Sequence, residues 1–245
     1  MLNKTYRHLI ICHLFYPSIA IELLQKLKYL DTQENCFLFN ISPGDSEDKK
    51  LISDARTFFP NSLIFTIPRK GRDIGAKLML INAALQLGIQ SKTTLIIHDK
   101  KSPHLDNGSS WRNELLKIIE PKYQEKIFNL FQTNSNIGII GTAEFVQNEY
   151  NPADRSFSCS SDKEIKEQLG KYKIKTDDYN FIAGNIFWIR TNLLQTFFKN
   201  RSILKIRSDL EWGNSLDFDK GTYIHAWERM MSWIATSQGY RIYGI

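Results

Sequence analysis

Apolar and polar positions alternate along the first hundred residues in a way that separates strands from helices. Short, mostly apolar runs at 6–14, 36–40, 63–67 and 94–97 are typical of buried strands. The stretches between them, 19–30, 50–58 and 75–87, predict helices. Strands separated by helices indicate an α/β fold with a mostly parallel sheet flanked by helices. Ligands of such sheets bind beyond the carboxyl ends of the strands, so we examined the polar residues that follow each strand.

The second half of the chain is less regular. Residues 110–119, 122–131 and 221–237 predict helices, and 137–141 predicts a strand. A last strand is expected at 240–243, ending before Gly244. The polar segment 144–170 contains Asn151-Pro152 and predicts a loop or mobile excursion. No segment has the composition of a linker, so a single domain over 1–245 is expected.

The net charge of the protein and the length of its apolar runs limit the kinds of molecule that it is expected to bind. The 245 residues carry a net charge of +6, which suits an anionic partner such as a nucleotide diphosphate or a lipid headgroup. Lysines are spread along the chain, so no nucleic-acid partner is expected. The apolar runs are far shorter than the roughly 20 residues of a membrane helix, and no signal peptide is evident. We therefore expect a cytoplasmic protein with three free thiols, at Cys12, Cys36 and Cys159.

The segment 68–75 combines charge with glycine just before a predicted helix. Arg69, Lys70 and Arg72 supply three cations within four residues, and Asp73 follows. A helix N-terminus with arginines nearby can hold a diphosphate. A basic turn whose glycines adopt positive φ explains the same residues. Both interpretations remain open at this point.

The run His98-Asp99-Lys100-Lys101-Ser102-Pro103-His104 follows a buried strand and is dense in charge. Asp99 could hold a divalent metal together with His98 and His104. Lys100 and Lys101 could neutralise phosphate oxygens on a leaving group. A solvated loop with an Asp99–lysine salt bridge is the alternative. Position at the carboxyl end of a strand favours a functional role.

Two later segments carry further candidates. In 181–190, Gly184 permits close approach of a ligand, Asn185 could bond sugar hydroxyls, and Phe187 is expected in the core; Trp188 is compatible with core or ligand stacking. In 221–237, helical spacing places one polar set and one apolar set on opposite faces. The polar set is His225, Glu228, Arg229 and Ser232, and the apolar set is Tyr223, Trp227, Met230 and Ile234. A surface Glu–Arg pair with a solvated histidine would explain the polar set equally well.

Taken in order, these segments resemble the rhamnan synthesis F family of bacterial polysaccharide glycosyltransferases. The pieces that carry the resemblance span nearly the whole chain: His13-Leu-Phe-Tyr16-Pro17, Gly71-Arg72-Asp73-Ile74-Gly75, His98-Asp99-Lys100-Lys101-Ser102 with His104, Gly108 to Arg112, Ile137-Gly138-Ile-Ile-Gly141, Ala183-Gly184-Asn185-Ile-Phe187-Trp188-Ile-Arg190, and Gly221-Thr222 with His225-Ala-Trp-Glu228-Arg229.

The resemblance implies a GT-A-like hexosyltransferase that moves a sugar, such as rhamnose or another deoxyhexose, from a nucleotide-sugar donor to a lipid-linked or polymeric glycan. The products would be surface polysaccharides such as O-antigen, capsule or rhamnan, made at the inner face of the plasma membrane by a peripherally associated enzyme. It also implies a nucleotide-binding half at about 1–105 and an acceptor and catalytic half at about 106–245. Donor binding is expected at Tyr16, Arg69, Arg72, Asp73, His98, Lys100, Lys101, Asn185 and Arg229.

The same resemblance frames the metal and the base. GT-A enzymes usually place a DXD motif at this strand end, but here His98-Asp99-Lys100 lacks the second aspartate. Either Asp99 binds Mn²⁺ or Mg²⁺ with His225 as a distant co-ligand, or the lysines replace the metal's charge. An inverting reaction needs a base, for which Asp219 and Glu228 are the candidates beside His225. The resemblance leads us to expect an acidic residue just before Gly221-Thr222, but Lys220 stands there. A retaining reaction would need no such base.

Two other classes fit parts of the pattern. A metal-dependent phosphoesterase acting on nucleotide sugars would use His98, Asp99, His104 and His225. A non-catalytic module that binds a glycan or a nucleotide would agree with the missing DXD aspartate. Hydrolysis without an acceptor would mark the first class, and nucleotide binding without sugar release would mark the second.

Overall fold

The computed structural model describes residues 5–42, 46–99, 108–213 and 220–245. Within them, seven strands form one sheet in the order β11-β5-β10-β4-β1-β2-β3. All neighbouring pairs are parallel except those of β10, which runs antiparallel to β4 and to β5. The strands are β1 (Thr5–Leu14), β2 (Asn35–Ile41), β3 (Leu63–Phe65), β4 (Gln90–His98), β5 (Ile137–Gly141), β10 (Phe187–Arg190) and β11 (Arg241–Gly244). The predicted mostly parallel sheet is confirmed.

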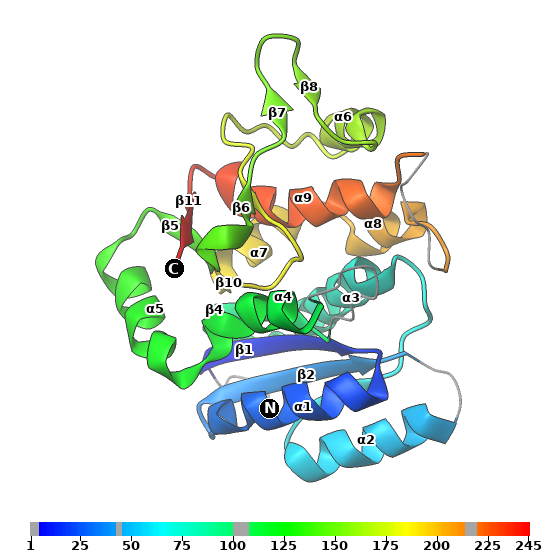
Figure 1. Cartoon of the computed structure of the whole chain (residues 1–245), viewed down its shortest axis with the longest axis vertical. Coiled ribbons are helices and arrows are strands. Elements are labelled where there is room, and N and C mark those ends of the chain that lie inside the picture. The colour runs from blue at the N-terminus through cyan, green and yellow to red at the C-terminus, as the bar shows by residue number, and fades with distance from the viewer. Residues whose placement is uncertain (1–4, 43–45, 100–107, 214–219) are drawn as a thin grey trace.

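Helices cover both faces of this sheet (Figure 1). They are α1 (Pro17–Leu27), α2 (Ser46–Phe58), α3 (Arg72–Gln86), α4 (Gly108–Leu115), α5 (Pro121–Thr133), α6 (Asp162–Lys171), α7 (Thr191–Phe198), α8 (Ile203–Asp209) and α9 (Tyr223–Thr236), with short 3₁₀ turns at Lys28–Leu30, Leu116–Ile119 and Ala143–Phe145. None of the helices in the described ranges combines the length and apolar composition needed to cross a bilayer.

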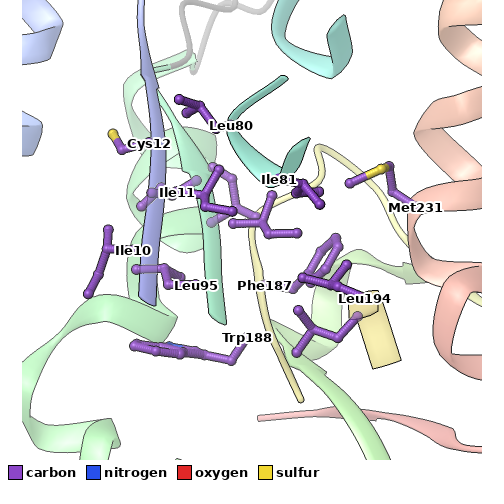
Figure 2. Packing of buried hydrophobic residues seen from close by; sticks show 14 of the residues in the cluster. Ile10, Ile11, Cys12, Leu80, Ile81, Leu95, Phe187, Trp188, Leu194 and Met231 are labelled. Carbon is purple, nitrogen blue, oxygen red and sulfur yellow. The ribbon is translucent and has the colours of Figure 1, made fainter. Parts of the chain in front are cut away.

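The core is built from the alternation of side chains along the central strands. Ile10 and Cys12 point to one side of β1, and Ile11 points to the other, where it meets Leu80 and Ile81 of α3 (Figure 2). Strand β10 divides in the same way. Phe187 faces the side of α7 and α9, and its buried neighbour Trp188 packs on His8 and Phe128 and donates from Nε1 to the Ile118 carbonyl. Both aromatics are fully buried, so Phe187 is in the core as expected, and so is Trp188.

Segment 144–170 is not a loop throughout, which corrects the prediction. It contains the ribbon strands β6 (Val146–Gln147), β7 (Tyr150–Asn151) and β8 (Ser156–Phe157), and then α6; β6 pairs with β9 (Phe181–Ile182). The sequence pattern did not predict helix α6 because one of the buried positions of this helix is polar. Gln168 is fully buried and accepts the Trp227 indole N–H at 3.0 Å, so the apolar period of the helix is broken.

Helices α7 and α8 were not predicted either, and two smaller expectations were wrong. Strand β11 includes Gly244, because the glycine is needed there: a Cβ would overlap Ala143. Tyr223, expected in the core, is only half-buried, and its hydroxyl donates to Glu167 at 2.8 Å. Trp227, Met230 and Ile234 are buried as expected.

Candidate active site

A cavity of about 410 Å³ opens beyond the carboxyl ends of β1, β2 and β4. The first turns of α3 and α9 and the turn at Gly184 complete its wall. The residues that sequence analysis singled out and that line this cavity are Tyr16, Arg69, Arg72, Asp73, His98, Asp99, His225 and Glu228. The location is the one where α/β sheets bind their ligands.

Asp99, directly after β4, fixes the turn that leads from β1 into α1. The backbone N–H of Phe15 lies 2.9 Å from Oδ1 and 2.8 Å from Oδ2, and the N–H of Tyr16 donates to Oδ2 at 2.5 Å. The Asp99 N–H donates in turn to the His13 carbonyl at 3.1 Å. The carboxylate thus holds Phe15 and Tyr16 on the cavity wall.

Burial dominates the ionisation of Asp99, which is only 3% exposed. The pKa of this carboxyl is raised to about 7: burial is the largest cause and the nearby Asp73 carboxylate adds to it, while the N–H groups of Phe15 and Tyr16 lower the pKa. The proton affinity of Asp99 is therefore set by the loss of water around it.

On the β2 side of the cavity, a series of hydrogen bonds links the residues that follow β3 to β2 and β1. The Ile67 N–H donates to Asn40 Oδ1 at 2.9 Å, which fixes the orientation of that amide. Asn40 Nδ2 therefore donates to His13 Nδ1, 2.9 Å away, so the proton of the neutral ring is on Nε2. Burial lowers the pKa of His13 to about 4, so its ring is neutral at pH 7.

The basic turn at 68–75 is shaped by its glycines. Gly71 has a φ of +78° and donates its N–H to the Glu211 carbonyl at 2.8 Å. Gly75 is needed for a different reason, since a Cβ there would overlap the carbonyl oxygen of Lys70. Both glycines therefore have structural roles, and the side chains of Arg69 and Arg72 are left to line the cavity.

The guanidinium of Arg69 is held between a ring and a carboxylate. Its Cζ lies 4.6 Å from the centroid of the Phe15 ring, and its Nη2 lies 3.8 Å from Asp48 Oδ2. The side chain of Arg69 remains 49% exposed. A guanidinium placed in this way can form bonds with phosphate oxygens without giving up its stacking contact.

Asp73 connects the first turn of α3 to a buried lysine. Its Oδ2 is 3.0 Å from Lys77 Nζ and 3.8 Å from His98 Nε2. Lys77 is fully buried, and its ammonium also donates to the Asn185 carbonyl at 2.9 Å. The lysine thus ties the Asp73 carboxylate to the turn at 184–185.

The N-terminus of α9 is occupied by side chains of the chain itself. Thr222 caps it by accepting the His225 N–H at 3.2 Å, and the Thr222 hydroxyl is 2.6 Å from His225 Nδ1. The carboxylate of Glu211 accepts the N–H groups of Tyr223 and Ile224 at 2.7 and 3.1 Å. These contacts orient the His225 ring at the cavity wall.

Glu228 lies one turn further along α9 and reaches the same cavity. Its Oε1 accepts the Gly184 N–H at 3.2 Å, and its side chain is 23% exposed. Asn185 Nδ2 donates to the Glu228 carbonyl at 2.8 Å. The side chain of Glu228 is therefore held by Gly184 on one side, its Oε2 lies 4.0 Å from Arg229 Nη1, and the carboxylate still lines the cavity.

Two predicted donor-binding residues are not brought to the cavity. Asn185 is fully buried, and its amide is used to bond the backbone of α9. Arg229 turns away and binds Glu149 through two hydrogen bonds of 2.8 Å each. The one-face pattern of α9 therefore splits, because helical spacing does not reveal which neighbour a side chain meets. Lys100, Lys101, His104 and Asp219 lie outside the described residues.

Some residues of the wall had not been proposed as site residues. They are His13, Phe15, Ser42, Ile74, Gly213 and Ile224, whereas Gly184, expected to allow close approach of a ligand, does line the cavity. His13 had a usable signal, because it is a polar residue near the carboxyl end of an otherwise apolar strand. Gly213 had none, since its place depends on how the chain returns from α8.

The described side chains do not form a ready-made metal centre. No group of three or more His, Cys, Asp or Glu side chains within the described ranges is arranged to hold an ion. Both oxygens of Asp99 are bonded to the N–H groups of the β1–α1 turn, which suits a positioning role better than a ligand role. We therefore derive no step of the chemistry through a metal at Asp99.

The family model of rhamnan synthesis protein F matches residues 1–240. The chain belongs to this family. Two curated relatives, the uncharacterized protein WxcX of two strains of Xanthomonas campestris pv. campestris, B100 and ATCC 33913, are each 28% identical over 176 residues, which is 71% of this chain. The chain spans only about a quarter (24%) of the length of these relatives.

Among solved structures, the chain is similar to the mannosyltransferase PcManGT from Pyrobaculum calidifontis in complex with GDP-Man and Mn²⁺. The match covers 99% of this chain and 55% of that one, with 12% sequence identity and a TM-score of 0.40. No conclusion about the activity of this chain follows from a likeness of this size.

Proposed function

We propose that this chain is a GT-A-like glycosyltransferase that moves a hexose, such as rhamnose or another deoxyhexose, from a nucleotide-sugar donor to a growing bacterial surface polysaccharide. One observation carries the proposal. A single cavity at the carboxyl ends of the parallel strands brings two arginines together with a fixed carboxylate and a fixed histidine. Membership in a family described by rhamnan synthesis supports the same class of product.

In this proposal the donor lies across the ends of β1 and β4. The guanidinium groups of Arg69 and Arg72 bind the diphosphate, because these two cations in the cavity wall match its two negatively charged phosphates. Lys100 and Lys101 are proposed to follow β4 as further cations for the leaving nucleotide. Tyr16, held by Asp99, lines the same end of the cavity.

The sugar faces the carboxylates at the other end. Asp73 pairs with Lys77, and its carboxylate oxygens can accept hydrogen bonds from sugar hydroxyls. Glu228 is proposed as the base that takes the proton of the acceptor hydroxyl in an inverting reaction, with His225 beside it. The acceptor is proposed to be a lipid-linked or polymeric glycan at the inner face of the plasma membrane.

The test begins with binding. Nucleoside diphosphates with guanine, uracil, thymine and adenine bases, each with and without Mn²⁺ or Mg²⁺, are added while the melting temperature is followed. A nucleotide that binds the folded chain raises this temperature by mass action. Arg72→Ala should remove the shift, and Arg241→Ala, at an exposed arginine of β11, should keep it.

The matching nucleotide sugar is then incubated with and without bacterial glycan acceptors. Transfer to the glycan supports the proposal. Hydrolysis of the nucleotide sugar to sugar 1-phosphate and nucleoside monophosphate, at the same rate with and without acceptor, would instead indicate the phosphoesterase. Nucleotide binding with no sugar release under any condition would indicate a binding module.

A further inference from the structure

Trp212 is the most exposed of the large apolar side chains in the described part of the protein. Its relative exposure is 64%, whereas the relative exposure of Trp188, Trp227 and Trp233 is 1% or less. A single exposed aromatic is ordinary on a protein surface, and by itself it indicates nothing. Two further observations distinguish this one.

The first observation is that the backbone around Trp212 is fixed. We define the 211–213 strap as Glu211, Trp212 and Gly213. It pairs in antiparallel fashion with the basic turn through a bridge between Trp212 and Lys70, and the Gly71 N–H donates to the Glu211 carbonyl at 2.8 Å. The indole is therefore presented by a segment that is bonded to the basic turn of the cavity.

The strap is also bonded on its other side. The Glu211 carboxylate accepts the N–H groups of Tyr223 and Ile224 at the start of α9, the helix that carries Glu228. The Lys70 ammonium lies over the indole, 5.1 Å from its centroid, and this contact favours one orientation of the ring. An aromatic ring ordered before binding loses little entropy when a ligand stacks on it.

The second observation is where the strap lies. Gly213, the next residue after Trp212, lines the cavity together with Glu228 and His225. Among the described residues, a Cβ added to Gly213 would meet no atom within 4 Å. The indole itself does not line the cavity: it lies with Lys70, one residue along the strap from the wall that carries the candidate base.

We propose that the indole of Trp212 is a stacking platform for a pyranose ring of the glycan acceptor. The inference rests on the proposed glycosyltransferase function. Aromatic faces bind the apolar C–H face of a pyranose, while the sugar hydroxyls stay in water. Further residues of a glycan stacked on the strap can extend towards the cavity that Gly213 and Glu228 line.

The donor nucleobase is the competing occupant, and position argues against it. The aromatic pair Phe15 and Tyr16, with ring centroids 4.8 Å apart, lines the cavity at the end of β1, where Arg69 also packs. A base bound there leaves the strap for the acceptor. The two assignments differ in which ligand should lose affinity when Trp212 is removed.

The experiment is saturation-transfer NMR on the whole chain with methyl α-L-rhamnopyranoside as the probe, in the presence of the nucleoside diphosphate that binds best. Magnetisation should reach the ring C–H protons of the probe with the wild type and with Trp212→Phe. Trp212→Ala should weaken probe binding by roughly threefold to tenfold. Leu204→Ala and Tyr243→Ala remove other exposed apolar side chains, at 57% and 38% exposure, and should leave probe binding unchanged.

Wild-type probe affinity in Trp212→Ala, or no transfer to the probe even with the wild type, overturns the inference. Loss of nucleotide affinity in Trp212→Ala overturns it too, and assigns the indole to the donor base. Nucleotide binding that still depends on Arg72 would then leave the proposed function standing. Absence of nucleotide binding in the wild type would count against the function itself, so the two failures are distinguishable.

Discussion

The ammonium group of Lys77 lies 3.0 Å from Oδ2 of Asp73, one turn earlier in α3, and the two side chains differ sharply in their access to water. The lysine side chain is 0% exposed and the aspartate side chain is 23% exposed. The pair is therefore asymmetric. The lysine depends on the aspartate for its counter-charge, whereas the aspartate can turn to water from the cavity.

This asymmetry predicts unequal costs for the two single substitutions. Asp73→Asn should lower the free energy of unfolding by about 3 kcal/mol or more, because a buried ammonium loses its counter-charge. Lys77→Met should cost clearly less, since the carboxylate left behind is partly solvated. Urea denaturation measures both, and the double variant should recover part of the loss at Asp73.

An exposed pair with the same spacing provides the control. Lys26 and Glu22 are 3.4 Å apart at i, i+4, with side chains 39% and 41% exposed. Lys26→Met should change the free energy of unfolding by about 0.5 kcal/mol or less. Equal costs for Asp73→Asn and Lys77→Met would contradict the burial argument.

Two glycines predict opposite effects of the same substitution. Gly75→Ala should destabilise the chain by about 1–3 kcal/mol, because the new methyl group overlaps the Lys70 carbonyl. Gly170→Ala, within α6 and with nothing within 4 Å of the new Cβ, should stabilise it by about 0.5–1 kcal/mol. Thermal unfolding of both variants checks this, and a stable Gly75→Ala variant would mean that the turn can relax.

Local pattern predicted most strands of the central sheet, but not β10, which lies between β5 and β4. The strands β1, β2, β4 and β5 contain short, mostly apolar runs, and the helices between the first of them carry a clear apolar face. Parallel topology brings the carboxyl ends of neighbouring strands to one edge of the sheet, while the grouping of Arg72, Asp73 and His98 as donor-binding residues was implied by the family resemblance. The regions that failed are those where polar groups are buried, as Gln168 is in α6.

The partners of charged residues could not be predicted from spacing. Arg229 shares a helix face with Glu228 in the sequence, yet it binds Glu149 from a segment 80 residues earlier. Asp99 had the charge of a metal ligand, and its backbone partners depend on the shape of the β1–α1 turn. Such contacts arise from the tertiary fold, and single-sequence periodicity contains no information about them.

The buried carboxyl of Asp99 predicts a definite pH dependence. Its pKa in the folded chain is raised to about 7, above the ordinary value of 3.8 for an aspartate, so the folded state holds the proton more tightly than the unfolded state between these values. The contribution of Asp99 to stability is therefore complete below about pH 4 and is lost as the pH rises towards 7.

The measurement compares the wild type with Asp99→Asn across this window. Because His13 is buried with a pKa of about 4, it contributes stability of the opposite sign, which rises with pH, and it is present in both proteins. The difference between the two unfolding curves isolates Asp99: the advantage of the wild type should shrink as the pH rises from 4 to 7. In the wild type the Asp99 carboxyl carbon should titrate near pH 7 by NMR, and a midpoint near 4 would contradict the burial argument.

Glu228→Gln provides the sharpest test of the proposed base. The amide oxygen of glutamine can still accept the Gly184 N–H, so the turn is kept and only the charge and proton affinity of the carboxylate are lost. With a working donor and acceptor, kcat should fall by a factor of about 10² to 10⁴, while the melting shift caused by the nucleoside diphosphate stays unchanged. Glu167→Gln, at an exposed carboxylate of α6, is the matched control and should keep wild-type turnover. Asp219→Asn is measured beside them: a loss of kcat there, with normal turnover in Glu228→Gln, would move the role of base to Asp219.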